Sequence, residues 1–201
     1  MNFILASKSP RRKEILENLG LAFRVLTADA DETCHKTEPT EYVKELALRK
    51  GTAVRDLLLA HDEMTEDTII IASDTVVAAE GEILGKPQDE KDAARMLRMF
   101  SGKAHQVISG VALLSLEKEV AVAEVTRVLF DKIPEDELRS YIASDEPYDK
   151  AGAYAIQGFA SLWITGIEGD YFNVVGFPVK RFSDLLRDHY GISLAQTVTK
   201  R

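Results

Sequence analysis

Four positively charged side chains crowd the start of a predicted helix close to the beginning of the chain: Lys8, Arg11, Arg12 and Lys13. Ser9 suits the N-cap position, and Pro10 suits the first helical position because its missing N–H has no helical partner there. Unpaired backbone N–H groups and the positive end of the helix dipole already lie at that end, so added cations are unfavourable without an anion. The spacing predicts a polyphosphate site, because Arg grips phosphate through paired hydrogen bonds. Four solvated charges are the alternative.

Asp74 is the second candidate for chemistry, because apolar sequence flanks it on both sides. Residues 68–72 form a largely apolar run typical of a strand covered on both faces, and a second apolar run occupies 76–79. A carboxylate left uncompensated in such surroundings is strongly unfavourable, so a positively charged partner is expected. If the strand instead ends at Ser73, Asp74 caps the following turn, and this alternative stays open.

Two lysines and an acidic loop are candidate neighbours of these groups. Lys50 falls on the apolar stripe of a predicted helix over 40–58. Its stem either covers apolar surface with the ammonium in water, or its amine points inward toward a cleft. Lys86 stands alone in a turn bounded by glycine and proline, while Asp31 and Glu32 belong to an acidic loop.

The candidate metal ligands are oxygen atoms, chiefly those of Asp74, with Asp31 and Glu32 as its candidate companions. The four histidines and the single cysteine, Cys34, show none of the spacings typical of zinc sites. Carboxylates that leave room for water and phosphate oxygens suit Mg²⁺ or Mn²⁺. Hydrolysis by an activated water is the reaction that requires least from these residues.

Composition and charge limit the class of protein. The 201 residues carry a net charge of −8, which argues against a nucleic-acid partner, since such proteins present broad basic surfaces. No stretch has the length and apolarity of a membrane span, and the start of the chain lacks a signal-peptide pattern. With its single cysteine, the chain is expected to be cytoplasmic.

Strand and helix patterns alternate, which predicts an α/β fold. We expect one domain over 1–192 and a flexible tail over 193–201. The expected strands are 2–6, 23–26, 68–72, 76–79, 107–116, 119–130, 162–167 and 171–175, with a turn and a short strand within 81–87. The expected helices begin near residues 10, 40, 89, 134 and 179.

Several segments together resemble the Maf family of nucleoside triphosphate pyrophosphatases. They occur in the family's order at 5–16, 73–77, 85–87, 97–102, 149–158 and 174–178. The resemblance implies an elongated, two-lobed α/β fold with a mixed sheet and a central nucleotide cleft, like that of the inosine triphosphate pyrophosphatase group. It also implies a homodimer.

The same resemblance implies residue roles. The family splits a nucleoside triphosphate between its α- and β-phosphates with a divalent metal, Mg²⁺ or Mn²⁺. Asp74 matches the family's catalytic proton acceptor, and Glu32 matches a carboxylate that acts with Asp74 at the metal. The matches to the polar and basic substrate-binding residues are Ser7, Arg12, Lys50 and Lys86.

Three further positions indicate a branch of the family. Arg11, Thr75 and Gln157 resemble the branch that acts on dTTP and UTP, rather than the branch resembling 7-methyl-GTP pyrophosphatases. A neutral Gln157 offers both a donor and an acceptor to a pyrimidine edge. Modified pyrimidine nucleotides are further candidate substrates. The alternative function is a regulatory module, linked to septum formation, that binds nucleotides without turnover.

Overall fold

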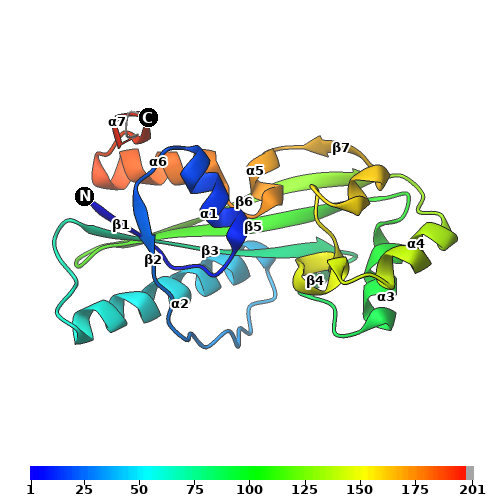
Figure 1. Cartoon of the computed structure of the whole chain (residues 1–201), viewed down its shortest axis with the longest axis horizontal. Helices are drawn as coiled ribbons and strands as arrows, with labels where there is room; N and C mark the ends of the chain where they lie inside the picture. Colours follow the sequence, from blue (N-terminus) through cyan, green and yellow to red (C-terminus); the bar gives the residue numbers. More distant parts are fainter. Residues whose placement is uncertain (198–201) are drawn as a thin grey trace. The chain divides into compact units, whose positions relative to one another are not determined.

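The computed structural model describes residues 1–197 of the chain. Its strands are β1 (Asn2–Leu5), β2 (Phe23–Val25), β3 (Thr68–Ala79), β4 (Glu82–Leu84), β5 (Ala104–Leu114), β6 (Glu119–Phe130) and β7 (Ile164–Glu168) (Figure 1). Its α-helices are α1 (Pro10–Asn18), α2 (Pro39–Ala60), α3 (Glu90–Phe100), α4 (Glu135–Ile142), α5 (Tyr171–Val175), α6 (Val179–Tyr190) and α7 (Leu194–Thr197). Short 3-10 helices occupy η1 (Glu146–Asp149), η2 (Ala151–Ala153) and η3 (Phe159–Trp163).

The strands form one mixed sheet, which confirms the predicted fold class. Within residues 1–197 its order is β2-β1-β3-β5-β6-β7, with β4 paired to β3. β1 runs parallel to both β2 and β3, and its register places Leu5 beside Val25 and Ile71. The β3–β4 and β6–β7 pairs are antiparallel.

The chain divides into two compact units. Unit 1 comprises Met1–Asp74, Ser109–Glu124 and the chain from Gly176 onward, and unit 2 comprises Thr75–Ile108 and Val125–Val175. The boundary therefore falls directly after Asp74. Each unit has its own buried apolar cluster.

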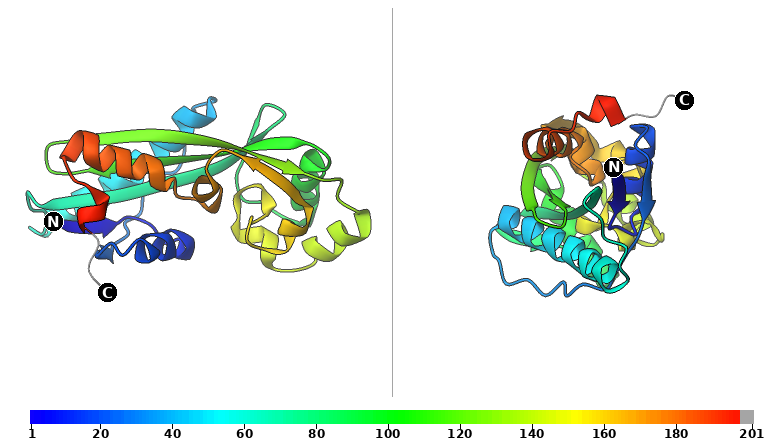
Figure 2. Two further views of the ribbon diagram at one scale, coloured as in Figure 1. Left: turned by 90° about the horizontal axis from the view of Figure 1, so that it is seen from above. Right: turned by 90° about the vertical axis from the view of Figure 1, so that its left-hand side faces the viewer.

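In unit 1, glycines let α2 approach the sheet closely. A Cβ at Gly110 of β5 would lie 2.5 Å from the Val43 carbonyl oxygen, and one at Gly51 of α2 would lie 2.3 Å from Leu114 Cδ1. A side chain at Gly110 would meet the backbone of α2 and force the helix and the strand apart, whereas one at Gly51 would displace the Leu114 side chain. α6 lies on the opposite side of the strands from α2 (Figures 1 and 2). Lys50, the neighbour of Gly51, belongs to this helix.

The core of unit 2 contains a buried histidine among aromatic rings. His105 stacks on Phe100 with ring centroids 4.1 Å apart, and it meets Phe130 and Tyr154 edge-on. Its Nε2 lies 2.6 Å from the Tyr154 hydroxyl, while its Nδ1 has no hydrogen-bond partner among the residues that the structure describes. Burial lowers the pKa of His105 to about 3, so this side chain is neutral at physiological pH.

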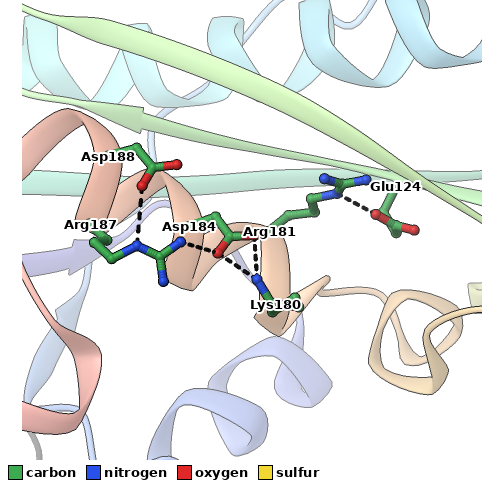
Figure 3. Close-up of polar contacts among 6 residues, drawn as sticks. All are labelled: Glu124, Lys180, Arg181, Asp184, Arg187 and Asp188. Carbon is green, nitrogen blue, oxygen red and sulfur yellow. Dashed lines mark hydrogen bonds and ion pairs between the residues drawn. The ribbon is translucent and has the colours of Figure 1, made fainter.

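The exposed side of α6 carries a set of ion pairs (Figure 3). Asp184 accepts hydrogen bonds from Lys180 Nζ at 2.5 Å and from Arg187 Nη2 at 2.8 Å. These two residues lie four positions before and three positions after Asp184, on the same face of the helix. Arg187 Nε also donates to Asp188 at 3.2 Å, and Arg181 pairs with Glu124 of β6. The helix ends at Gly191, whose φ of 66° is left-handed.

Most predicted elements are confirmed within one or two residues, and two expectations are wrong. The strand expected at 171–175 is the helix α5, because Asp170 accepts a hydrogen bond from the Phe172 N–H and so caps a turn. The interruption expected at Ser73 is absent from the described chain, where β3 runs unbroken through Asp74. The expected tail holds the short helix α7, and residues 198–201 lie outside the described residues. Among residues 1–197, no helix is both long and apolar enough to span a membrane.

Candidate active site

The loop between β1 and α1 closes around the Ser7 hydroxyl. Ser7 Oγ accepts hydrogen bonds from the Ser9 N–H and from Arg12 Nη1, both at 3.2 Å. α1 begins at Pro10 with Ser9 at the N-cap as predicted, but among residues 1–197 the Ser9 hydroxyl makes no capping hydrogen bond. The first turn of α1 holds no acidic residue. The first turn of α1 therefore supplies no carboxylate to its own cations, although Lys13 pairs with Glu17 one turn further on at 3.6 Å.

The Gly176 carbonyl joins Arg12 to the central strand β3. It accepts a hydrogen bond from Arg12 Nε at 2.9 Å and a longer one from the buried Ser73 hydroxyl at 3.4 Å. Burial is the main influence on the Arg12 guanidinium and lowers its pKa. The Asp74 carboxylate opposes this pKa shift, and neighbouring Arg11 adds to it. The charge of Asp74 therefore acts on Arg12, which is expected if the two side chains belong to one site.

Lys50 is the cationic partner that Asp74 was expected to have. Its Nζ lies 2.6 Å from Asp74 Oδ1 and 3.2 Å from Glu32 Oε2. The Asp74 side chain is 11% exposed and that of Lys50 is 21% exposed, so water screens their attraction only partly. The Lys50 amine therefore contacts carboxylates. Because β3 continues past residue 74, the turn-capping interpretation of Asp74 is wrong.

Tyr42 belongs to the same group, and sequence reasoning missed it. Burial raises the pKa of its half-buried phenol, and the nearby charges of Asp74, Cys34 and Glu32 raise this pKa further, whereas Lys50 lowers it. Tyr42 lies two turns before Lys50 on α2. Its position on the helix that carries Lys50 was the available signal.

The remaining sequence-predicted residues lie in unit 2. Thr75 is half-buried directly after Asp74, whereas Lys86 and Gln157 are exposed. The Gly152 N–H donates to the Gly85 carbonyl at 3.0 Å, and a Cβ at Gly152 would lie 2.7 Å from Val77 Cγ2. Gly152 also has a left-handed φ of 68°. This contact joins the segment that carries Gln157 to the turn that carries Lys86.

The carboxylates of Glu32 and Asp74 fit one kind of metal site. Within residues 1–197, no group of three or more His, Cys, Asp or Glu side chains is arranged to hold a metal ion. A closed site built from protein ligands alone therefore does not match these residues. Mg²⁺ commonly binds through one or two carboxylates together with substrate phosphates and water, and two carboxylates on a shared lysine meet that requirement.

Fold and site together describe an α/β protein with a cationic loop beside a lysine–carboxylate group. The chain belongs to the Maf family, because the family model described as Maf-like protein matches residues 2–189. A relative from Pelotomaculum thermopropionicum, named dTTP/UTP pyrophosphatase, is 48% identical over 187 residues, covering 92% of this chain and 94% of the relative.

The chain is also similar to a second relative and to a solved structure. A relative from Caldanaerobacter subterraneus subsp. tengcongensis, also named dTTP/UTP pyrophosphatase, is 44% identical over 194 residues, covering 96% of this chain and 91% of the relative. The solved structure of the Staphylococcus aureus Ham1 protein covers 98% of this chain and 94% of its own, with a TM-score of 0.46 and 12% identity.

Proposed function

We propose that this chain is a nucleoside triphosphate pyrophosphatase that hydrolyses dTTP and UTP to the monophosphate and pyrophosphate. The names of relatives that align over nearly the whole chain support this activity. The observation that carries the proposal is the 2.6 Å contact between Lys50 and the largely buried Asp74, whose charge acts on Arg12. A carboxylate kept beside cations that would hold a polyanion has a use in catalysis rather than in binding alone.

The cations of unit 1 are suited to phosphate. Arg12 presents a guanidinium already oriented by Ser7 and Gly176, and a preordered guanidinium loses little entropy when it binds phosphate oxygens. Arg11 and Lys50 add positive charge to the same unit. In the proposed reaction these groups oppose the charge that develops on the phosphates.

Asp74 is proposed as the base that accepts a proton from the attacking water. An ionised carboxylate is an acceptor at both oxygens, and Oδ1 already accepts from Lys50 at 2.6 Å. This bond orients the carboxylate, so its acceptor geometry is set before the substrate arrives. Water that has lost its proton to Asp74 attacks the α-phosphorus, and pyrophosphate leaves.

A divalent cation, Mg²⁺ or Mn²⁺, is part of the proposal. Glu32 and Asp74 are the residues that would hold it, and when bound it would neutralise phosphate charge and polarise the reacting group. When no divalent cation is bound, Lys50 contacts both carboxylates and so offsets their mutual repulsion.

Substrate selection is assigned to residues of the family pattern. Gln157 is proposed to meet the pyrimidine edge with one donor and one acceptor, with Thr75 and Lys86 as further substrate contacts. Modified pyrimidine nucleotides are included among the candidate substrates. A homodimer and a reducing, cytoplasmic location complete the proposal, the latter supported by the single cysteine.

A substrate panel in ¹⁸O-labelled water tests this function. Purified protein is incubated with dTTP, UTP, CTP or GTP, with Mg²⁺, with Mn²⁺ or with a chelator, and pyrophosphate and orthophosphate are measured. We expect metal-dependent pyrophosphate from dTTP and UTP, with the ¹⁸O in the monophosphate because water attacks the α-phosphorus. Binding of dTTP without pyrophosphate under any condition would instead identify a regulatory binding module.

A further inference from the structure

The carboxylate of Glu32 comes from a segment without helix or strand. Residues 26–38 connect β2 to α2 in irregular conformation. The Glu32 side chain is 63% exposed, yet its Oε2 reaches Lys50 Nζ at 3.2 Å. An irregular, exposed segment samples many conformations unless side chains fix it. The position of this carboxylate therefore needs an explanation outside its own residue.

Arg49 fixes the backbone on both sides of Glu32. Its Nη1 donates to the Asp31 carbonyl at 3.2 Å and to the Thr33 carbonyl at 2.7 Å. The Asp31 carboxylate in turn accepts a hydrogen bond from the Thr33 N–H at 2.8 Å, which closes a tight turn around Glu32. These bonds restrain the peptide groups on either side of Glu32.

Arg49 is itself anchored on α2. Its Nε donates to Glu45 Oε1 at 2.9 Å, one helical turn earlier. This bond fixes the plane of the guanidinium on α2. In that orientation Nη1 points at the loop carbonyls. Lys50 is the next residue along α2. One helix turn thus holds both the loop that carries Glu32 and the lysine that Glu32 contacts.

We propose that Arg49 is a positioning residue that fixes the Glu32 carboxylate beside Lys50 and Asp74 and thereby sets the affinity of this carboxylate pair for a divalent cation. The inference rests on the proposed function, in which Glu32 and Asp74 hold that cation. Arg49 bonds to the backbone of the residues flanking Glu32, so its effect on the metal passes through the loop.

The single cysteine of the chain reports directly on the loop. Cys34 follows Thr33, whose carbonyl Arg49 holds, and is half-buried. With a chelator present and no nucleotide, we expect Arg49→Gln to raise the rate of Cys34 reaction with a disulfide reagent several-fold. Removing a cation from the neighbourhood by itself tends to slow thiolate chemistry, so a faster reaction reports an opened loop.

Arg55 supplies the matched control. It lies on the same helix and pairs with Glu119 at 3.0 Å, away from the loop. Arg55→Gln removes an equal charge from α2 and should leave the Cys34 rate unchanged. Arg49→Lys keeps the charge but has one nitrogen in place of the two that bind Glu45 and the loop carbonyls. Its rate should therefore lie nearer to that of Arg49→Gln than to wild type.

Mn²⁺ affinity is measured with Mn²⁺ alone, by the paramagnetic resonance signal of the free ion. We expect Arg49→Gln to weaken Mn²⁺ binding by about 10-fold, as is usual when the group that orients a metal ligand is removed. In a Glu32→Gln background, Arg49→Gln should weaken Mn²⁺ binding no further. Thermal unfolding of each variant controls for general damage.

The outcomes separate this inference from the proposed function. An unchanged Cys34 rate in Arg49→Gln would show that Arg49 does not hold the loop and would overturn the inference. A faster rate with unchanged Mn²⁺ affinity would overturn it as well. Failure of the wild-type protein to release pyrophosphate would refute the proposed function alone, because neither readout here requires turnover.

Discussion

The two units bury ionisable groups in opposite ways. In unit 1, the carboxylate of Asp74 and the amine of Lys50 contact each other at 2.6 Å. In unit 2, His105 is surrounded by aromatic rings and loses its charge, because burial lowers its pKa to about 3. The first arrangement places a carboxylate against an amine, whereas the second surrounds a neutral ring with aromatic side chains.

The difference separates the group that we propose to be reactive from a structural one. A charge pair held largely out of water gains little net stability, since desolvation offsets most of the attraction. Its presence therefore indicates a use for the charges themselves. A neutral histidine bonded to Tyr154 at 2.6 Å contributes packing and one hydrogen bond. We accordingly expect loss of the Asp74 carboxylate to affect turnover most, and substitutions around His105 to affect stability.

Asp74→Asn should have the largest effect. The amide keeps the shape of the side chain but cannot accept a proton from water at neutral pH, so pyrophosphate release should fall by about 10²- to 10⁴-fold. Binding of dTTP, measured by calorimetry, should persist because Arg12 and Lys50 are retained. Turnover equal to that of wild type would show that Asp74 is not the base.

Lys50→Met tests whether the stability of the fold depends on pairing the Asp74 carboxylate with the Lys50 amine. The variant keeps the apolar stem and leaves the largely buried Asp74 without its 2.6 Å partner. We expect a loss of about 2 kcal/mol in the free energy of unfolding, less than for a fully buried pair because Lys50 retains some contact with water. Urea denaturation measures this loss.

The double variant Lys50→Met with Asp74→Asn is the control for that loss. Removing both charges should restore part of the stability, because no uncompensated carboxylate then remains at position 74. A double variant that is less stable than Lys50→Met alone would contradict the charge argument.

His105→Phe tests the neutral arrangement through pH. The pKa of His105 is about 3 in the folded chain against an ordinary value of 6.5, so between these values the unfolded chain binds more protons and stability falls as pH is lowered. This contribution is at most about 1.4 kcal/mol per pH unit. Phenylalanine does not titrate, so wild type should lose stability relative to His105→Phe as the pH falls from 7 to 4.5.

Tyr154→Phe is the companion variant in denaturation measurements at several pH values. It removes the hydroxyl that bonds His105 but leaves the imidazole in place, so the pH dependence should remain. Parallel pH profiles for wild type and His105→Phe would mean that His105 is not held neutral by burial.

Strong local patterns made much of the fold predictable. The apolar stripe of α2 and the apolar run of β3 identified both elements, and the position of Asp74 within that run identified its need for a cation. Lys50 emerged as a candidate because it interrupts an apolar stripe. The physical signal in each case is a charge where the pattern calls for burial.

Contacts between distant residues were not predictable from these patterns. Residues 171–175 look like a strand, yet they form a helix in which the buried Asn173 amide donates to the Val107 carbonyl and to Thr126 Oγ1, both at 3.0 Å. Arg49 resembles an ordinary surface arginine until the loop carbonyls are placed beside it. The local sequence pattern does not indicate which residues distant in the chain will contact these side chains.

Asp184→Asn should have the smallest effect and so sharpens the contrast within unit 1. Asp184 accepts from Lys180 and Arg187 on the surface of α6 (Figure 3). The hydrogen bond from Lys180 is the main influence that lowers the pKa of this carboxyl, but exposed pairs are screened by water and salt. We expect the thermal unfolding midpoint to move little and pyrophosphate release to stay at the wild-type rate. A loss of turnover comparable to that of Asp74→Asn would mean that removing any paired carboxylate lowers turnover. The distinction between the Lys50–Asp74 pair and the surface of α6 would then be wrong.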